Sequence, residues 1–435
     1  MKNFLAKLVL VIWKSTFSLI LKRSSLQKKT LRFLSNNEIH SRLAAKKQRE
    51  EPVNVLFVCH EPCLWSMFES IYQAMLNDPQ FSPLIITLPY KHASDSAVSL
   101  RDGGMGAFLD ERGIPHTVGY DTVSGKWKRI ETFCPDYVFF QTPYGLFSKK
   151  WSIDHVSLIA RVCYLPYGTT LFGGEVENIV HPVSFFKHVS LICKESEFTE
   201  KQFVAKFEKC DWFRESRLRV TGLPKLDRLF GEVAVTGKIW PRGVSAAIRR
   251  ILWTPRWTTS EGACHFFDYK AFFSEFCTSH KGVDFAFRPH PLCLKNFISN
   301  KEMTETALSQ MREYYTASSN MVIDEGGDYI DTFLSCDVLV SDLSSMMLEF
   351  LGTGKPIVYT HRVDLFNDLG RELSKGVYWV CDEVELKETL DMLLRGDDPL
   401  YQIRQGLIES TLCLPEGGAG LSVKEAIREE FSVSV

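Results

Sequence analysis

The chain has 435 residues, of which 45% are hydrophobic and 24% are charged, as in an ordinary globular protein. A chain of this length exceeds one ordinary hydrophobic core, so two domains are expected. The formal net charge of −2 excludes the strongly basic surface that nucleic acids require, and no nucleic-acid partner is expected.

The first fifty residues are predicted to associate with a membrane. Their apolar run is interrupted by Lys7 and Lys14, which leaves no uncharged stretch of about 20 residues to span a bilayer. On a helical projection these lysines lie opposite a face that carries Trp13, as in helices of the membrane interface. The basic stretch 22–49 favours an anionic cytoplasmic leaflet. We therefore expect a peripheral protein at the cytoplasmic face of the cell membrane; the alternatives are a helix packed on the protein's own body and a signal anchor.

Apolar runs alternate with amphipathic stretches from residue 51 to residue 230. The runs predict buried strands at residues 53–59, 84–88, 137–141, 162–165, 189–193 and 218–221. The stretches between them predict helices at residues 64–76, 98–112, 153–159 and 198–207. This alternation indicates a parallel sheet that is covered on both faces, as in a Rossmann-like domain.

A second series of the same kind follows a weakly patterned stretch at residues 231–248, which is predicted to link two domains. Strands are expected at residues 251–253, 285–287, 321–323, 338–340 and 357–359. Helices are expected at residues 266–276, 294–315, 329–336, 346–351 and 383–394. Residues 249–435 are therefore predicted to form a second Rossmann-like domain, with the ligand in the cleft between the two domains.

The twelve cysteines include no Cys-x-x-Cys pair, so zinc-ribbon and thioredoxin motifs have no support. Several of them, such as Cys163 and Cys193, fall in apolar runs, where cysteine behaves as a small hydrophobic residue. We expect reduced thiols in a reducing compartment.

The strongest chemical signal is the segment 336–356, in which a short apolar strand runs into a turn and then a helix. Ser344 and Ser345 occupy the turn, and free amides at a helix N-terminus bind anions such as a diphosphate. Asp342 belongs to the same predicted site, although aspartate also caps helices without any ligand. Glu349 is expected to reach a ribose hydroxyl; the alternative is a solvated helix face.

A second signal is an apolar strand that ends in Arg288 and His290, each followed by a proline. Arginine offers a planar fork of donors to phosphate, and histidine can donate a proton to a leaving phosphate. Two further turns are predicted to face the same cleft. One carries Gly222 and Lys225, and the other carries Arg256 and Thr258.

Together these four segments resemble the CDP-glycerol glycerophosphotransferase family, the teichoic-acid-type polyol-phosphate primases and polymerases. The resemblance covers roughly residues 210–420, and its last two motifs are the specific ones. It implies a GT-B fold, a CDP-activated polyol donor, and no metal or other cofactor. It also implies a lipid-linked or polymeric glycan acceptor, bound on the N-terminal domain. The matching positions are Gly222, Pro224 and Asp227; Pro255, Arg256 and Trp257; Arg288, His290 and Pro291; and Ser341, Asp342, Ser344 and Ser345.

The N-terminal half departs from this family. Its polymerases carry a Trp-His-Gly-Thr-Pro segment whose histidine serves as the acceptor-side base, whereas this chain has Tyr167 at that position, before Gly168. A phenol with a pKa of about 10 is a poor base at neutral pH. His60, with Glu61 beside it, follows the first predicted strand and is the candidate replacement; the alternative is a structural role for His60.

The predicted reaction is in-line attack of an acceptor hydroxyl on the phosphorus nearest the polyol, with loss of a nucleoside monophosphate. The catalytic candidates are His290, His60 and Tyr167. Two alternatives stay open. One is a GT-B glycosyltransferase that uses a nucleotide sugar for surface polysaccharide synthesis. The other is a non-catalytic membrane-bound scaffold.

Overall fold

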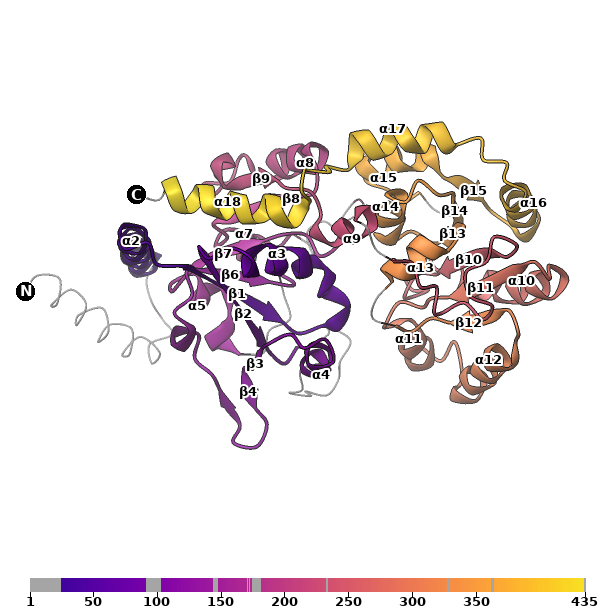
Figure 1. The fold of residues 1–435 in the computed structure, drawn as a ribbon, viewed down its shortest axis with the longest axis horizontal. Coiled ribbons are helices and arrows are strands. Elements are labelled where there is room, and N and C mark those ends of the chain that lie inside the picture. Colours follow the sequence, from indigo (N-terminus) through magenta and orange to yellow (C-terminus); the bar gives the residue numbers. More distant parts are fainter. Residues whose placement is uncertain are drawn as a thin grey trace, which may run out of the picture.

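The computed structural model describes residues 25–90, 103–143, 148–169, 171, 173, 181–231, 234–326, 329–360 and 364–433. Two parallel sheets with helices on both faces lie side by side along the long axis of the molecule (Figure 1). The strands of the first sheet run in the order β3-β2-β1-β6-β7-β8-β9, and those of the second in the order β12-β11-β10-β13-β14-β15. The second order is that of a doubly wound dinucleotide-binding sheet.

The first sheet consists of β1 (Val53–Cys59), β2 (Phe81–Thr87), β3 (Thr117–Val118), β6 (Tyr137–Phe140), β7 (Arg161–Tyr164), β8 (Leu191–Lys194) and β9 (Leu218–Val220). A separate hairpin consists of β4 (Tyr120–Asp121) and β5 (Lys126–Trp127). The second sheet consists of β10 (Arg249–Thr254), β11 (Val283–Phe287), β12 (Met321–Ile323), β13 (Val338–Ser341), β14 (Ile357–Thr360) and β15 (Tyr378–Val380).

The helices around the first sheet are α2 (Ser25–Gln48), α3 (Ser66–Leu76), α4 (Met105–Asp110), α5 (Ile153–Val156), α7 (Val183–Phe186), α8 (Glu197–Phe207) and α9 (Asp227–Phe230). Those that follow are α10 (Phe266–Ser279), α11 (Cys293–Ser299), α12 (Glu305–Ala317), α13 (Ile330–Ser335), α14 (Met346–Leu351), α15 (Asp368–Leu373), α16 (Glu383–Leu394), α17 (Tyr401–Thr411) and α18 (Ala419–Val433).

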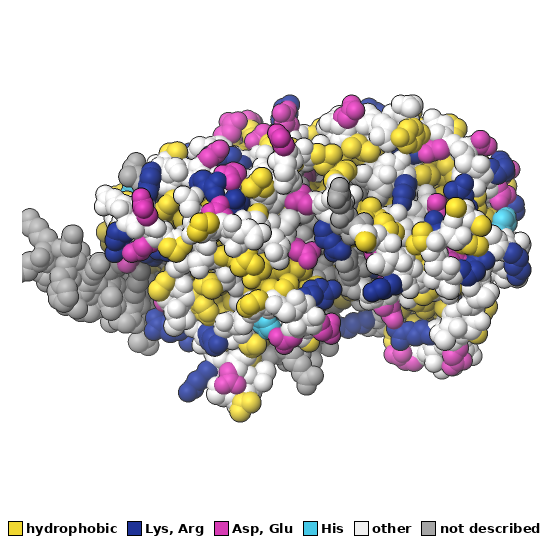
Figure 2. All heavy atoms as spheres, in the orientation of Figure 1, with side chains coloured by type: hydrophobic (Ala, Val, Ile, Leu, Met, Phe, Trp, Pro, Cys, Tyr) yellow, Lys and Arg dark blue, Asp and Glu magenta, His cyan; other side chains and the backbone are white. Residues whose placement is uncertain are grey.

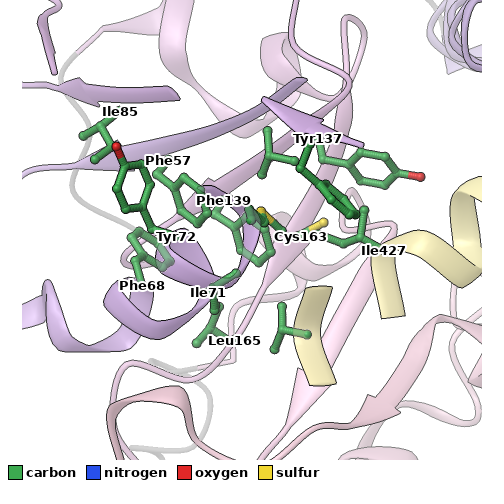
Figure 3. Packing of buried hydrophobic residues seen from close by; sticks show 14 of the residues in the cluster. Phe57, Phe68, Ile71, Tyr72, Ile85, Tyr137, Phe139, Cys163, Leu165 and Ile427 are labelled. Carbon is green, nitrogen blue, oxygen red and sulfur yellow. The ribbon is translucent and has the colours of Figure 1, made fainter. Parts of the chain in front are cut away.

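Aromatic side chains dominate the first core. Phe57 of β1 stacks on Phe139 of β6 with ring centroids 5.3 Å apart, and Phe68 of α3 closes over both (Figure 3). Strands that are covered on both faces have no polar side to show, which explains why they appear in the sequence as continuous apolar runs. The expected α/β architecture is therefore confirmed.

The last helix crosses back to the first domain. In Figure 1, α18 lies over the first sheet, far from α16 of the second domain. Val423, Ala426 and Ile427 are buried in the first core. The sequence interpretation placed all of residues 249–435 in the second domain, and this is wrong for α18. Its apolar face matches the first core, a tertiary fact that local periodicity does not carry.

Part of the predicted membrane segment is instead packed on the protein. Leu43 of α2 is fully buried, and Lys46 Nζ lies 2.6 Å from the buried carboxylate of Asp136, which also pairs with Arg42. Two cations of the basic stretch 22–49 therefore serve the fold. The amphipathic helix predicted within residues 1–24 lies outside the described residues. In the part of the chain that the structure covers, no helix is both long and apolar enough to cross a bilayer.

Local predictions failed where the chain turns without a strong breaker. The helix predicted at residues 294–315 is two helices, α11 and α12, separated by a turn in which Lys301 adopts a positive φ of 61°. The predicted linker 231–248 is anchored to the second domain, because Trp240 is buried there and donates to Ser335 Oγ over 2.7 Å.

Candidate functional site

Two predicted donor-binding residues meet each other across the domain junction. Lys225, in the turn after β9, donates a hydrogen bond to Glu349 of α14, and a second one to the carbonyl of Tyr167 over 2.9 Å. Tyr329 donates to the other carboxylate oxygen of Glu349 over 2.5 Å. Burial raises the pKa of Tyr329 well above its ordinary value, which keeps the phenol protonated as a donor. Glu349 is only 2% exposed, so the solvated helix face is wrong, while the ribose contact stays a prediction.

Arg288 lies beside the cluster of Lys225, Glu349 and Tyr329, at the end of the strand that the sequence predicts. It follows β11, and its guanidinium donates to Asp324 over 2.6 Å and to the carbonyl of Gly326 over 2.7 Å. The guanidinium also lies 5.5 Å from the ring centre of Tyr329. Asp324 holds the arginine in place, which is how a phosphate-binding arginine is pre-oriented.

Asp342 organises a loop. It is fully buried at the end of β13, where it accepts hydrogen bonds from the backbone N–H of Arg256 over 2.8 Å and of His265 over 3.0 Å. Thr360 donates to its other oxygen. Burial raises the pKa of Asp342, and these donors oppose that rise. Asp342 therefore does not cap α14, whose first flanking residue is Ser345, and its direct contact with a ligand stays a prediction.

The turn after β10 is fixed by the same network. The guanidinium of Arg256 pairs with Glu261 and donates to the carbonyl of Leu343 over 3.0 Å. The Thr258 hydroxyl lies 2.9 Å from that of Ser260 and is 2% exposed. These two predicted donor-binding residues shape the loop at the switch point between β10 and β13, where doubly wound sheets bind their ligands.

Three further predicted site residues are less buried than Glu349 and Asp342; they are His290, Ser344 and Ser345. His290 is exposed, and its Nδ1 accepts from the backbone N–H of Leu292 over 3.1 Å. The Ser344 hydroxyl accepts from the backbone N–H of Met346 over 3.1 Å. Ser345 meets the first domain: a Cβ built on Gly168 would lie 3.2 Å from its hydroxyl. These serines therefore stand at the junction, beside the loop that carries Tyr167.

Gly222, by contrast, serves the crossing of α18. Its φ is +75°, and a Cβ there would lie 2.5 Å from the carbonyl of Cys413. Asp227 of the same turn accepts from the backbone N–H groups of Ala419 and Gly420 over 2.7 and 2.8 Å, which caps α18. Gly222 therefore has a packing role, and its predicted contact with the donor stays a prediction.

His60 is buried rather than open to the cleft. It is 1% exposed, its ring stacks on Tyr90 with centroids 4.1 Å apart, and its Nε2 lies 3.2 Å from the Thr142 hydroxyl. The structural alternative for His60 is therefore the better description. The role of His60 as the acceptor-side base stays a prediction.

Tyr167 lines a pocket that the sequence interpretation missed. The pocket opens at the carboxyl ends of β7 and β8, and its lining includes Thr169, Lys194 and Glu195. Thr169 donates to Glu195 Oε1 over 3.0 Å, and Lys194 Nζ lies 3.3 Å from Oε2. The signal was present in the sequence, because a charged pair directly follows a predicted buried strand. No group of His, Cys, Asp and Glu side chains in the described residues has the arrangement of a metal site.

The middle of the chain is similar to a known protein family. Residues 194–369 match the family described as CDP-Glycerol:Poly(glycerophosphate) glycerophosphotransferase. The match covers less than half of the chain and shows that these residues are similar to this family. The match contains all four motif segments of the second half, so the resemblance drawn from them is confirmed, and the chain is a glycerophosphotransferase-like transferase.

Solved structures of two other proteins have the same fold as this chain. The wall teichoic acid polymerase TagF is 13% identical, with a TM-score of 0.58 over 100% of this chain and 99% of that chain. A UDP-GlcNAc 2-epimerase from Neisseria meningitidis, bound to UDP-GlcNAc, is 12% identical, with a TM-score of 0.56 over 88% of this chain and 100% of that chain. At such identities the likeness shows the two-domain GT-B fold alone. A search of curated proteins found no match.

Proposed function

We propose that this protein transfers a polyol phosphate from a CDP-activated donor to a lipid-linked or polymeric glycan acceptor. The observation that carries the proposal is the family match over residues 194–369, which contains the complete donor-side motif set. A TagF variant soaked with CDPG shares the fold, with a TM-score of 0.56 at 12% identity over 99% of this chain and 98% of that chain.

The donor diphosphate is assigned to the junction beside Arg288, His290 and the turn of Ser344. Lys and Arg side chains gather along the junction on the face drawn in Figure 2, which favours an anionic ligand there. Arg288 is pre-oriented by Asp324, and His290 is exposed, so both suit contact with a phosphate that arrives from solvent. The chemistry required of the protein is positioning and charge neutralisation.

The acceptor is assigned to a membrane, and the protein to its cytoplasmic face. Support comes from the alternating basic and apolar residues of the N-terminal segment, which precedes α2. Deletion of residues 1–23 is expected to release the protein from anionic vesicles without changing nucleotide affinity. Sedimentation of the truncated protein with the vesicles at the full-length level would contradict this assignment.

The donor assay compares radiolabelled CDP-glycerol, CDP-ribitol and UDP-GlcNAc, with a lipid-linked glycan acceptor. Transfer of the label with release of CMP is expected from a CDP-polyol, and none from the UDP-sugar. His290→Ala and Ser344→Ala are each expected to reduce transfer at least about 10²-fold, the scale of losing one charge-stabilising or proton-donating group. His155→Ala, in the first domain, is the matched control. Transfer from UDP-GlcNAc alone would favour the glycosyltransferase alternative, and activity of the two variants near wild type would remove them from the site.

A further inference from the structure

The pocket beside Tyr167 lies where a second substrate of a two-domain transferase is expected. Tyr167 and Thr169 follow β7, and Glu195 follows β8, so they stand together at the carboxyl edge of the first sheet. Ligands of open parallel sheets gather at this edge. Asn367, which precedes α15 of the second domain, lines the same pocket, so residues of both domains contribute to it.

Glu195 is the chemically conspicuous residue of this pocket. It is 3% exposed, and Thr169 fixes one of its carboxylate oxygens over 3.0 Å. The other oxygen, Oε2, accepts no hydrogen bond from the residues that the structure describes, although Lys194 Nζ lies 3.3 Å away. A buried carboxylate oxygen without a hydrogen-bond donor costs free energy, and a hydroxyl group bound in the pocket would supply the missing donor.

The pocket adjoins the donor side. Gly168, one residue before Thr169, leaves a hypothetical Cβ only 3.2 Å from the hydroxyl of Ser345. Two backbone hydrogen bonds hold this loop against the second domain, from Gly173 to the carbonyl of Leu365 over 3.0 Å and from Asn367 to the carbonyl of Leu171 over 2.9 Å. An acceptor in the pocket would therefore approach a diphosphate held beside Ser345.

We propose that this pocket receives the acceptor hydroxyl and that Glu195 is the base that takes its proton. The assignment rests on the proposed function. The acceptor oxygen forms a bond to the phosphorus nearest the polyol, the bond from that phosphorus to the bridging oxygen breaks, CMP leaves, and the proton passes to Glu195 Oε2 and then to water. Lys206, also in the lining, complements the phosphate groups of a polyol-phosphate acceptor.

The other candidates for the base fit less well. His60 stacks on Tyr90 and is not among the residues that line this pocket, and the phenol of Tyr167 starts from an ordinary pKa of about 10. A carboxylate is an established base for hydroxyl groups in phosphoryl transfer, where its main effect is to orient the nucleophile.

The decisive variant is Glu195→Gln, which keeps the size of the side chain and removes its basicity. We expect its kcat to fall about 10²–10⁴-fold, the usual effect of losing a general base, with CDP affinity by calorimetry unchanged. The acid limb of the kcat/KM profile against pH should be present in the wild type and absent in the variant. Glu197→Gln, two residues along and exposed, is the matched control and should keep both rate and profile.

Two further variants separate a base from a structural role. Thr169→Val removes the hydrogen bond that orients the carboxylate and should lower kcat about 10-fold with little change in the acceptor KM. Lys206→Ala should raise the acceptor KM with kcat nearly unchanged. If Glu195→Gln unfolds or loses CDP binding, Thr169→Val decides, and a normal kcat in that variant overturns the proposal.

The transfer assay tests the proposed function and the assignment of Glu195 separately. Transfer by the wild type from a UDP-sugar alone would overturn the proposed function, and the Glu195→Gln comparison would then be made with that donor. With whichever donor the wild type uses, a rate for Glu195→Gln within a few-fold of wild type overturns the assignment of the base.

Discussion

Two buried carboxylates, one in each domain, stand at the carboxyl edge of their sheets in opposite states. Asp342 of the second domain accepts from two backbone N–H groups and from the Thr360 hydroxyl, so both of its oxygens are occupied. Glu195 of the first domain accepts from Thr169 on one oxygen, while the other receives no hydrogen bond within the described chain. A satisfied carboxylate holds structure, and an incompletely satisfied one is available for chemistry.

A residue of a family motif can have a structural role, and a residue outside every motif can be the reactive one. Asp342 belongs to the most specific motif of the family, yet its contacts explain its presence through the loop that they fix. Glu195 belongs to none of the four motif segments, and its surroundings point to reactivity. The family signature thus marks how the donor side is built, whereas the acceptor side must be judged from geometry.

The largest expected effect is at the contact between the two domains. Lys225→Met leaves Glu349 buried with Tyr329 as its hydrogen-bond donor but without a cation, which typically costs about 3–5 kcal/mol of unfolding free energy. Urea unfolding measures it. If the pair clamps the junction rather than binding donor, CDP affinity of the folded variant should stay near that of the wild type.

Lys201→Met is the matched control for this experiment, because Lys201 pairs with Glu197 on the surface. Surface pairs contribute less than about 1 kcal/mol. A loss below 1 kcal/mol in Lys225→Met, together with weaker CDP binding, would show that the pair serves the donor and would weaken the contrast drawn between the domains.

The second effect tests Asp342 directly. Asp342→Asn replaces a carboxylate oxygen with an NH₂ group that faces existing donors, so one of them loses its acceptor at a cost of about 1–3 kcal/mol. Transfer should fall as well, because the loop of Arg256 and His265 depends on this carboxylate. Asp368→Asn, at an exposed aspartate, is the control. Full stability in Asp342→Asn would place Asp342 among ligand-binding residues after all.

The third effect is a pair of opposite pH responses. Burial, aided by the charge of Arg32, lowers the pKa of His188 to about 4, while Asp154 and Ser157 also face its ring and Lys187 lies nearby. The unfolded histidine titrates near 6.5, so it binds more protons than the folded one between these values. Stability of the first domain is therefore lost as pH falls from about 6.5 toward 4, by about 1–2 kcal/mol after solvent screening.

Asp342 predicts the reverse slope in the second domain. Because burial raises its pKa, its stabilising contribution is complete below the unfolded value of 3.8 and is lost as pH rises through the folded value. Unfolding at several pH values should show a shallower acid-side loss in His188→Gln than in the wild type, and a steeper one in Asp342→Asn, which lacks the contribution that opposes the loss. The same acid-side slope in wild type and His188→Gln would remove His188 as its source.

Much of the fold was predictable from sequence because parallel strands that are buried on both faces appear as continuous apolar runs. The strand expected at residues 321–323 is β12 to the residue, and β1 likewise. The strands β3 and β15 were missed because they are only two and three residues long, too short for a run of apolar residues to stand out. The position of α18 was missed because packing on the first sheet is not a local property.

The candidate site was predictable only in part, for the same reason. Arg288 stands where its strand predicts, beside the junction. The partners of Asp342 come from positions 256, 265 and 360, and nothing in the sequence ties them together before the chain folds. Lys225 and Glu349 were both assigned to the donor, but their opposite charges across 124 positions form a pair that only the folded chain reveals.

The smallest expected effect concerns the residue at the position of the family's histidine. Lys225 donates a hydrogen bond to the backbone carbonyl of Tyr167, and Tyr167→Phe leaves this bond in place. Loss of a neutral hydrogen bond costs about 1 kcal/mol, so transfer by Tyr167→Phe should stay within several-fold of wild type. The matched measurement is Glu195→Gln in the same preparation. A loss of 10²-fold or more in Tyr167→Phe, with Glu195→Gln near wild type, would mean that the tyrosine has taken over the proton. The first domain would then resemble its family more closely than the comparison with Asp342 suggests, because the base would have changed its residue type but kept its place in the chain.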